Sequence, residues 1–239
     1  RSFADSNADG IGDLNGITSR LDYLSRLGVD AIWLSPIFPS PDVDFGYDVS
    51  EYCDIDPKHG TLADFDRLVQ EAHNRGIRII LDLVLNHTSD QHPWFQQSRS
   101  SKDNPYRDWY LWREGQGTTR PPNNWQSVFG GSAWQPDAST GEYYYHMFYR
   151  EQPDLNWRNP TVRRALLDVF KFWLDRGVDG FRLDVFNLYF KDDQFRDNPL
   201  KLGLRGFDRQ QHFYDCDRPE MLPLLREIRV LLDSYPERY

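Results

Sequence analysis

Three stretches of the chain repeat one order of an amphipathic helix, a glycine and a short apolar strand. Residues 16–28 place apolar side chains three or four positions apart and end at Gly28, which predicts a helix. The apolar residues 29–35 that follow predict a strand. The other predicted elements are helices over 61–75, from Pro160 and over about 219–234, and strands over 77–87 and 178–184.

Strands that alternate with helices and are apolar on both faces are typical of a parallel sheet. The strands over 77–87 and 178–184 carry Asp, Arg, Asn or His toward their ends, and no glycine-rich phosphate motif is present. Charged residues at the carboxyl ends of strands favour a (β/α)₈ barrel over a doubly wound sheet, although both folds place their sites there. We therefore expect an α/β fold, the N-terminal part of a (β/α)₈ TIM barrel, with the rest of a parent chain needed to close it.

The spacing of the repeats indicates an inserted subdomain after the strand predicted over 77–87. Gly76 and Gly177 are about twice as far apart as Gly28 and Gly76. Residues 88–159 between the copies are rich in Trp, Tyr, Pro, Asn and Gly and have little helical periodicity. The predicted organisation is 1–87 for the first part of the barrel, 88–159 for an irregular subdomain, and 160–239 for the barrel continued.

The charge, the hydropathy and the cysteine content limit which binding partners and which cellular compartment are expected. The 37 acidic and 28 basic residues give a formal charge of −9, which disfavours nucleic acid. No apolar stretch approaches the roughly 20 residues that span a bilayer, so no membrane partner is expected. The two cysteines are too few for a disulfide framework, and we expect free thiols in a cytoplasmic protein.

A loop near the start of the chain carries oxygen-bearing residues at alternate positions. Asp5, Asn7, Asp9 and Asp13, with the carbonyl of Ile11, could wrap a hard cation, so we expect a structural Ca²⁺ site with Mg²⁺ as the alternative. The loop lacks the glutamate that an EF-hand has at its twelfth position. The competing interpretation is an Asx-rich turn that caps the next helix.

Polar residues at two strand ends are the candidate catalytic groups. Arg182 and Asp184 are two apart on a strand and should point to the same side, so the guanidinium would keep the carboxylate ionised. An ionised Asp at a strand end is a candidate nucleophile, and a structural ion pair is the alternative. Asp82 and His87 at the end of the preceding strand favour the catalytic interpretation, because several polar groups then converge.

The loop after the first strand adds candidate sugar-binding groups. Asp44 and Tyr47 lie in a Phe-Gly-Tyr-Asp sequence, and carboxylates beside an aromatic ring suit the hydroxyls and the C–H face of a sugar. An ordinary polar loop with a packed tyrosine is the alternative.

Six stretches together resemble the α-amylase superfamily of glycoside hydrolases, in its oligo-1,6-glucosidase and α-glucosidase branch. They are DSNADGIGDLNGI, VDAIWLSPIFPSP, FGYDVSEY, DLVLNH, QPDLNW and GFRLDVFN. The resemblance implies Asp184 as catalytic nucleophile with Arg182 as its partner, and the loop of residues 5–13 as a metal site. It further implies substrate-binding roles for Asp44, Tyr47, His87, Asp82, Phe129 and Phe148. It also implies a (β/α)₈ barrel with an inserted subdomain after the third strand, in agreement with the insertion over 88–159.

The resemblance implies a retaining α-glucosidase that removes terminal α-linked glucose from short oligosaccharides or glucosides. The family's general acid would lie beyond this sequence, so residues 1–239 alone are expected to be inactive. Val185 favours α-1,6 linkages and the SVFGG segment favours α-1,4 linkages, so the linkage stays open. Two alternatives remain: a transglycosylase of the sucrose isomerase or trehalose synthase type, and a non-catalytic relative such as the heavy chain of amino-acid transporters.

Overall fold

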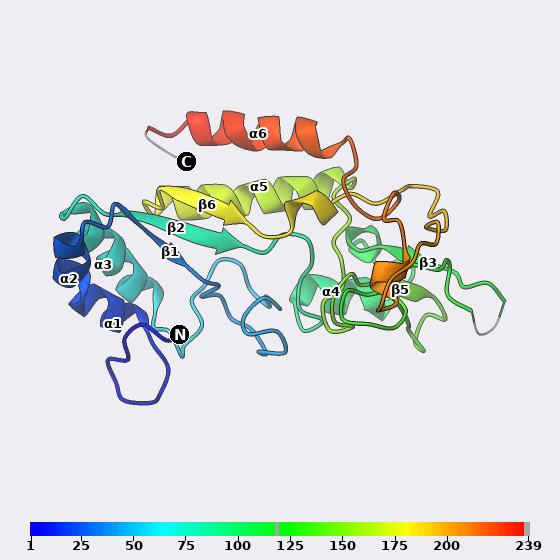
Figure 1. The fold of residues 1–239 in the computed structure, drawn as a ribbon, viewed down its shortest axis with the longest axis horizontal. Helices are drawn as coiled ribbons and strands as arrows, with labels where there is room; N and C mark the ends of the chain where they lie inside the picture. Colours follow the sequence, from blue (N-terminus) through cyan, green and yellow to red (C-terminus); the bar gives the residue numbers. More distant parts are fainter. Residues whose placement is uncertain (118–119, 237–239) are drawn as a thin grey trace.

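A parallel sheet of three strands forms the centre of the structure, a computed structural model that describes residues 1–117 and 120–236. The strands β1 (Ala31–Leu34), β2 (Arg78–Leu83) and β6 (Gly180–Leu183) lie in the order β1-β2-β6 (Figure 1). Both pairs are parallel, as the alternation of helices and strands predicted. In the described part of the chain the sheet is open and the barrel is not closed.

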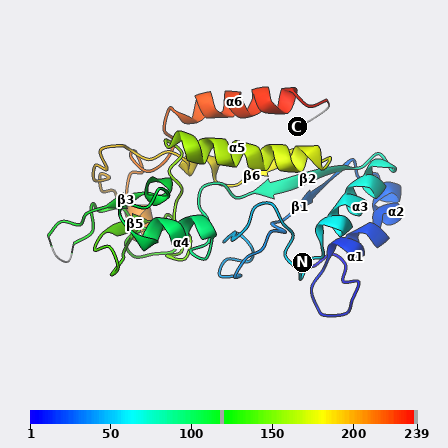
Figure 2. The ribbon, with the colours of Figure 1, turned by 180° about the vertical axis from the view of Figure 1, so that it is seen from behind.

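Helices lie along the sheet beside the strands that they connect. The helices α1 (Leu14–Ser19), α2 (Leu21–Leu27) and α3 (Leu62–His73) lie next to β1, and α5 (Pro160–Asp175) lies next to β6 with α6 (Met221–Asp233) beyond it (Figures 1 and 2). Their apolar faces share one core with the sheet side chains Ile79 and Leu81, which are at most 1% exposed. The opposite face of the sheet is less covered, and Trp33 on it is 51% exposed.

The single helix expected over 16–28 is two short helices. Arg20 leaves helical geometry with φ −110° and ψ 6°, and its N–H bonds to the carbonyls of Ile17 and Thr18. The hydroxyls of Thr18 and Ser19 donate to carbonyls of the preceding turn, which competes with the regular helical pattern. The prediction of one continuous helix was therefore wrong, and Gly28 ends the second helix with φ 83°.

Helix α3 begins with a reciprocal capping box. The Thr61 side chain accepts from the N–H of Asp64, and the Asp64 carboxylate accepts from both the N–H and the hydroxyl of Thr61. In the full-length parent protein, Thr61→Ala should lower the free energy of unfolding by about 0.5–2 kcal/mol, because the Asp64 N–H loses its acceptor and the Asp64 carboxylate loses the Thr61 hydroxyl. Urea denaturation measures this, with Thr61→Ser as the control that keeps the hydroxyl. An equal loss in both variants would contradict the capping role.

The insertion holds more regular structure than its composition suggested. It contains α4 (Pro93–Ser100) and an antiparallel sheet in the order β3-β5-β4. The strands are β3 (Trp112–Arg113), β4 (Trp134–Pro136) and β5 (Tyr143–Tyr145), and the insertion also holds the 3₁₀ turn η1 (Arg107–Trp109). Two further 3₁₀ turns, η2 (Phe186–Leu188) and η3 (Phe207–Arg209), lie in the loop after β6. Pro93 at the first helical position, after a His92 cap, is the local signal for α4 that periodicity missed.

A second core cluster lies in this region, apart from the core beneath the sheet. Trp125, Trp134 and Tyr145 of the insertion form its centre. Side chains from the loop after β6, among them Leu188 and Phe195, pack against them. The loop over 185–216 therefore completes the core of the insertion, which the sequence had not indicated.

The cysteines and the hydropathy of the helices bear on the expectations drawn from composition. Cys53 and Cys216 are free and not paired with each other, as predicted. Among the described residues, no helix combines the length and the apolar character that crossing a membrane requires.

Candidate active site

The register of β2 against β6 brings the charged residues of both strands together. Asp82 pairs directly with Arg182 across the parallel ladder, so both side chains leave the same face of the sheet. Asp184 lies just after β6, and its N–H still donates to Leu83 O at 3.0 Å. Its side chain therefore projects on the same face as Arg182, two positions back, as the sequence predicted.

Arg182 joins the two carboxylates. Its Nη1 lies 2.6 Å from Asp184 Oδ1 and 2.9 and 3.1 Å from the two oxygens of Asp82. Asp82 is fully buried and Asp184 is 8% exposed, whereas the Arg182 side chain is 44% exposed. One cation thus orients two carboxylates at adjacent strand ends.

Burial changes the pKa that we expected for Asp184 from its pairing with Arg182. It raises the pKa of Asp184 above its ordinary value, and the opposing effect of Arg182 is smaller. The expectation that the guanidinium alone decides the charge of Asp184 was incomplete, because sequence does not reveal desolvation. Burial likewise raises the pKa of Asp82 to about 6, with Arg182 again opposing.

A raised carboxyl pKa makes stability fall as pH rises. The folded protein keeps a proton on Asp82 up to about pH 6, whereas the unfolded chain loses it near pH 3.9. Between these values the unfolded state binds fewer protons, so this group costs stability with increasing pH. Asp82→Asn removes this pH-dependent cost. In the parent protein, the unfolding free energy of the variant should therefore rise relative to that of wild type between pH 4 and pH 7. Denaturation at both pH values tests this, and a constant difference would contradict it.

Tyr47 connects the loop after β1 to these carboxylates. Its hydroxyl donates to Asp82 Oδ2 at 3.2 Å, and burial together with the charge of Asp82 raises the Tyr47 pKa to about 12. The N–H of Tyr47 donates to Asp44 O at 2.9 Å, which closes the turn that carries both residues. The predicted groups Asp44, Tyr47, Asp82 and Asp184 therefore belong to one neighbourhood.

His87 lies against the same loop and is 1% exposed. Its Nε2 is 3.1 Å from the Tyr47 carbonyl, and burial lowers its pKa. Gln152, which the sequence analysis did not single out, lies between His87 and Asp44. Its Nε2 is 3.0 Å from Asp44 Oδ2 and 3.1 Å from His87 Nε2. The QPDLNW stretch was the only signal that could have drawn attention to it.

Aromatic rings continue outward from His87. Phe148 packs on the His87 ring at 5.2 Å between centroids, and Phe129 is 5.8 Å from Phe148. Tyr149 stacks on Phe129 at 4.2 Å. Phe129 is 50% exposed and Tyr149 is 38% exposed, so the row runs from the buried imidazole to the surface. Tyr149 was not expected from the sequence.

The residue after the candidate nucleophile has a strained backbone. Val185 has φ 39° and ψ 38°, in the left-handed region that β-branched residues rarely adopt. Such strain concentrates at functional sites, where surrounding packing holds it. Here it turns the chain sharply after Asp184 and into the 3₁₀ turn η2.

The loop over 5–13 uses its oxygens within the chain. Asp5 accepts from the N–H groups of Asn7, Ala8 and Gly10, and Asp9 accepts from Ile11 N at 2.8 Å. Asp13 caps α1 through Gly16 N, as the alternative of a capping turn predicted. Among the described residues, no group of three His, Cys, Asp or Glu side chains is arranged to hold a metal. This geometry does not supply a ready cation cage, and the calcium site stays a prediction.

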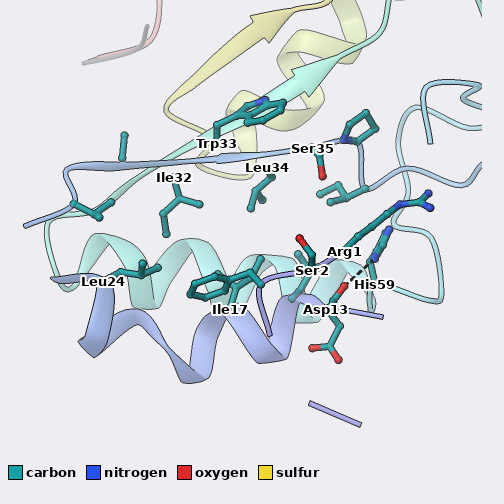
Figure 3. A pocket seen from close by; sticks show the side chains of 17 residues that line it. Arg1, Ser2, Asp13, Ile17, Leu24, Ile32, Trp33, Leu34, Ser35 and His59 are labelled. Atoms are coloured by element: carbon teal, nitrogen blue, oxygen red, sulfur yellow. Dashed lines mark hydrogen bonds between the residues drawn. The ribbon is translucent and has the colours of Figure 1, made fainter. Parts of the chain in front are cut away.

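A cavity of about 370 Å³ lies elsewhere, between β1 and the helices α1 and α2 (Figure 3). Ile17, Leu24, Ile32 and Leu34 line it, and His59 lies at its polar end. None of the candidate catalytic or sugar-binding residues borders this cavity.

Comparison with known proteins decides the family. The model of the α-amylase catalytic domain matches residues 1–239, the whole chain. The chain belongs to the α-amylase family.

Relatives in the α-amylase family carry glucosidase names. A probable alpha-glucosidase of Rhizobium meliloti is 54% identical over 99% of this chain and 45% of its own length. The oligo-1,6-glucosidase of Parageobacillus thermoglucosidasius is 52% identical over 98% of this chain and 42% of its length. The solved alpha-glucosyl transfer enzyme XgtA superposes with a TM-score of 0.96 at 53% identity, covering 99% of this chain and 46% of that one.

A second solved relative has a different activity in its name. The trehalulose synthase MutB from Pseudomonas mesoacidophila MX-45 has a TM-score of 0.88 at 44% identity, over 100% of this chain and 42% of that one. The chain thus spans less than half the length of these relatives.

Proposed function

We propose that the parent protein is a retaining α-glucosidase that removes terminal α-linked glucose from short oligosaccharides or glucosides. The observation that carries the proposal is the position of Asp184, held at a strand end by Arg182 and near Asp44, Tyr47 and His87. The similarity to alpha-glucosidases and oligo-1,6-glucosidases supports the same class of reaction.

In the proposed reaction, a carboxylate oxygen of Asp184 attacks the anomeric carbon while the bond to the leaving oxygen breaks. The leaving oxygen takes a proton from a general acid, and water then opens the glucosyl ester with return of the proton. Retaining enzymes place the two carboxyl groups about 5–5.5 Å apart. We infer that the acid comes from the rest of the parent chain, in a closed (β/α)₈ barrel, and that residues 1–239 alone are inactive.

The groups around Asp184 suit the binding of a terminal glucose. Asp44 supplies a carboxylate and Tyr47 a hydroxyl, and Phe148 supplies an apolar ring beside His87. Sugars are recognised by this combination of polar groups for hydroxyls and rings for the C–H face.

Product analysis with the full-length protein tests the proposal. Isomaltose, maltose and sucrose are offered separately, and free glucose should be the main product, released first as the α-anomer. The relative rates on isomaltose and maltose determine the linkage, for which Val185 favours α-1,6 and the SVFGG segment favours α-1,4. Release of β-glucose, or no turnover of any of the three, would contradict the proposal.

A transglycosylase is the second candidate, because a glucosyl transfer enzyme and a trehalulose synthase are 53% and 44% identical to this chain. It shares the step at Asp184 and differs in the acceptor that opens the intermediate. Isomerised disaccharide from sucrose with little free glucose would favour it over hydrolysis.

A further inference from the structure

A buried lysine lies beneath the candidate site and contacts no group that we expect to touch substrate. Lys191 is 1% exposed, and its Nζ donates to Asp154 Oδ2 at 2.5 Å, to Asn86 Oδ1 at 2.9 Å and to the carbonyl of Leu188. Asp154 is fully buried and also accepts from Met147 N at 2.8 Å. This cluster joins the segment after β2, the insertion and the loop after β6.

The cluster fixes the orientation of the Asn86 amide. Lys191 can only donate, so the atom facing it must be the amide oxygen. Asp154 as a carboxylate can only accept, so the atom 2.8 Å from its Oδ2 must be the amide nitrogen. Both contacts require the same orientation, and the NH₂ group of Asn86 therefore lies 3.2 Å from His87 Nδ1.

An NH₂ group facing Nδ1 requires that this nitrogen accepts. A proton on Nδ1, in the other neutral tautomer or in the cation, would place two donors against each other. The opposite nitrogen, Nε2, faces the carbonyl of Tyr47 at 3.1 Å and must donate there. The Gln152 amide is fixed because its Oε1 accepts from Tyr149 N at 3.0 Å and its Nε2 donates to Asp44 Oδ2 at 3.0 Å. The same Nε2 atom lies 3.1 Å from His87 Nε2, a contact that opposes a proton there, whereas the Tyr47 carbonyl favours one. No carbonyl faces Nδ1 among the contacts of the described residues, so the proton belongs on Nε2.

We propose that Lys191 and Asp154 are positioning residues that act through Asn86 to keep Nδ1 of His87 unprotonated, so that the ring presents an N–H at Nε2. His87 then stays a neutral donor beside Asp44 and Gln152, on the side where the proposed function places the sugar. Three carboxylates, those of Asp154, Asp184 and Asp44, act on His87 in the direction of protonation, and burial opposes them. The Asn86 amide adds a directional restraint at Nδ1.

The double variant Lys191→Met, Asp154→Asn tests this in the full-length protein without leaving a buried charge unpaired. Met147 N–H should hold the new amide oxygen at position 154, so its NH₂ group replaces Oδ2. Asn86 must then turn its oxygen toward position 154 and toward His87. That oxygen calls for a proton on Nδ1, the reverse of wild type. Lys171→Met, Asp168→Asn, which removes an exposed pair on α5, is the matched control.

The main readout is the protonation of Nδ1, by ¹⁵N-histidine NMR with His87→Asn to assign the signal. We expect an unprotonated Nδ1 in wild type and in the control, and a protonated Nδ1 in the double variant. KM should rise about tenfold more than kcat falls, because the ring then no longer presents its N–H to the sugar. This second readout rests on the proposed function, whereas the NMR signal needs no substrate.

Asn86→Asp gives an independent measurement if the double variant does not fold. It keeps Lys191 and places an oxygen against Nδ1, so Nδ1 should again be protonated. An unprotonated Nδ1 in either folded variant would overturn the proposal, and so would a protonated Nδ1 in wild type. If the NMR result holds and no glucoside is turned over, the proposed function fails while the positioning role stands.

Discussion

Replacing Asp184 by asparagine in the full-length protein is expected to lower kcat roughly 10⁴- to 10⁶-fold, the range seen when single catalytic residues are removed from a serine protease. The amide keeps the shape of the carboxylate but cannot form the glucosyl ester. Arg182 keeps its ion pair with Asp82 and its side chain is 44% exposed, so the guanidinium stays paired and solvated and the fold should persist. Turnover of an aryl α-glucoside measures the effect.

A chemical rescue separates a lost nucleophile from a damaged site. In Asp184→Gly, azide should occupy the vacated space and attack the anomeric carbon, giving β-glucosyl azide as the aryl group leaves. Asp168→Asn, at an exposed carboxylate on α5, is the control and should leave kcat unchanged. Near-normal turnover of Asp184→Asn, or an azide product of α configuration, would rule out the nucleophile.

The second large effect concerns stability. Lys191→Met should lower the unfolding free energy of the parent protein by about 3–5 kcal/mol, because it leaves the fully buried Asp154 without its counter-ion. The exposed Lys171–Asp168 pair provides a matched comparison, and Lys171→Met should cost less than about 1 kcal/mol. Urea denaturation near pH 7 measures both. Equal losses would show that the burial of the pair adds nothing.

The residues that sequence predicted best are those fixed by short-range rules. Arg182 and Asp184 lie on one side because alternate residues of a strand do, and Asp82 joins them because parallel strands end at one edge. Helix α5 begins at Pro160 and is followed by a glycine, as the pattern indicated.

The features that the sequence did not predict depend on contacts between distant segments or on burial. Gln152 and Lys191 are polar residues in stretches without periodicity, and only the packing of the insertion against β2 and the loop after β6 buries them. The pKa of Asp184 escaped prediction for the same reason, because its main cause is desolvation. The break at Arg20 arises from side-chain hydrogen bonds that an apolar stripe does not reveal.

The shared packing between the insertion and the loop over 185–216 has a consequence for chimeras of related enzymes. Trp125 donates its indole N–H to Arg196 O, and Phe195 lies 5.6 Å from the Trp125 ring centroid. A graft that transplants residues 88–159 alone would separate these surfaces and expose apolar area on both. Recombination that exchanges the two segments together preserves the contacts, so crossover points belong before residue 88 and after residue 216, with the nucleophile strand carried along between them.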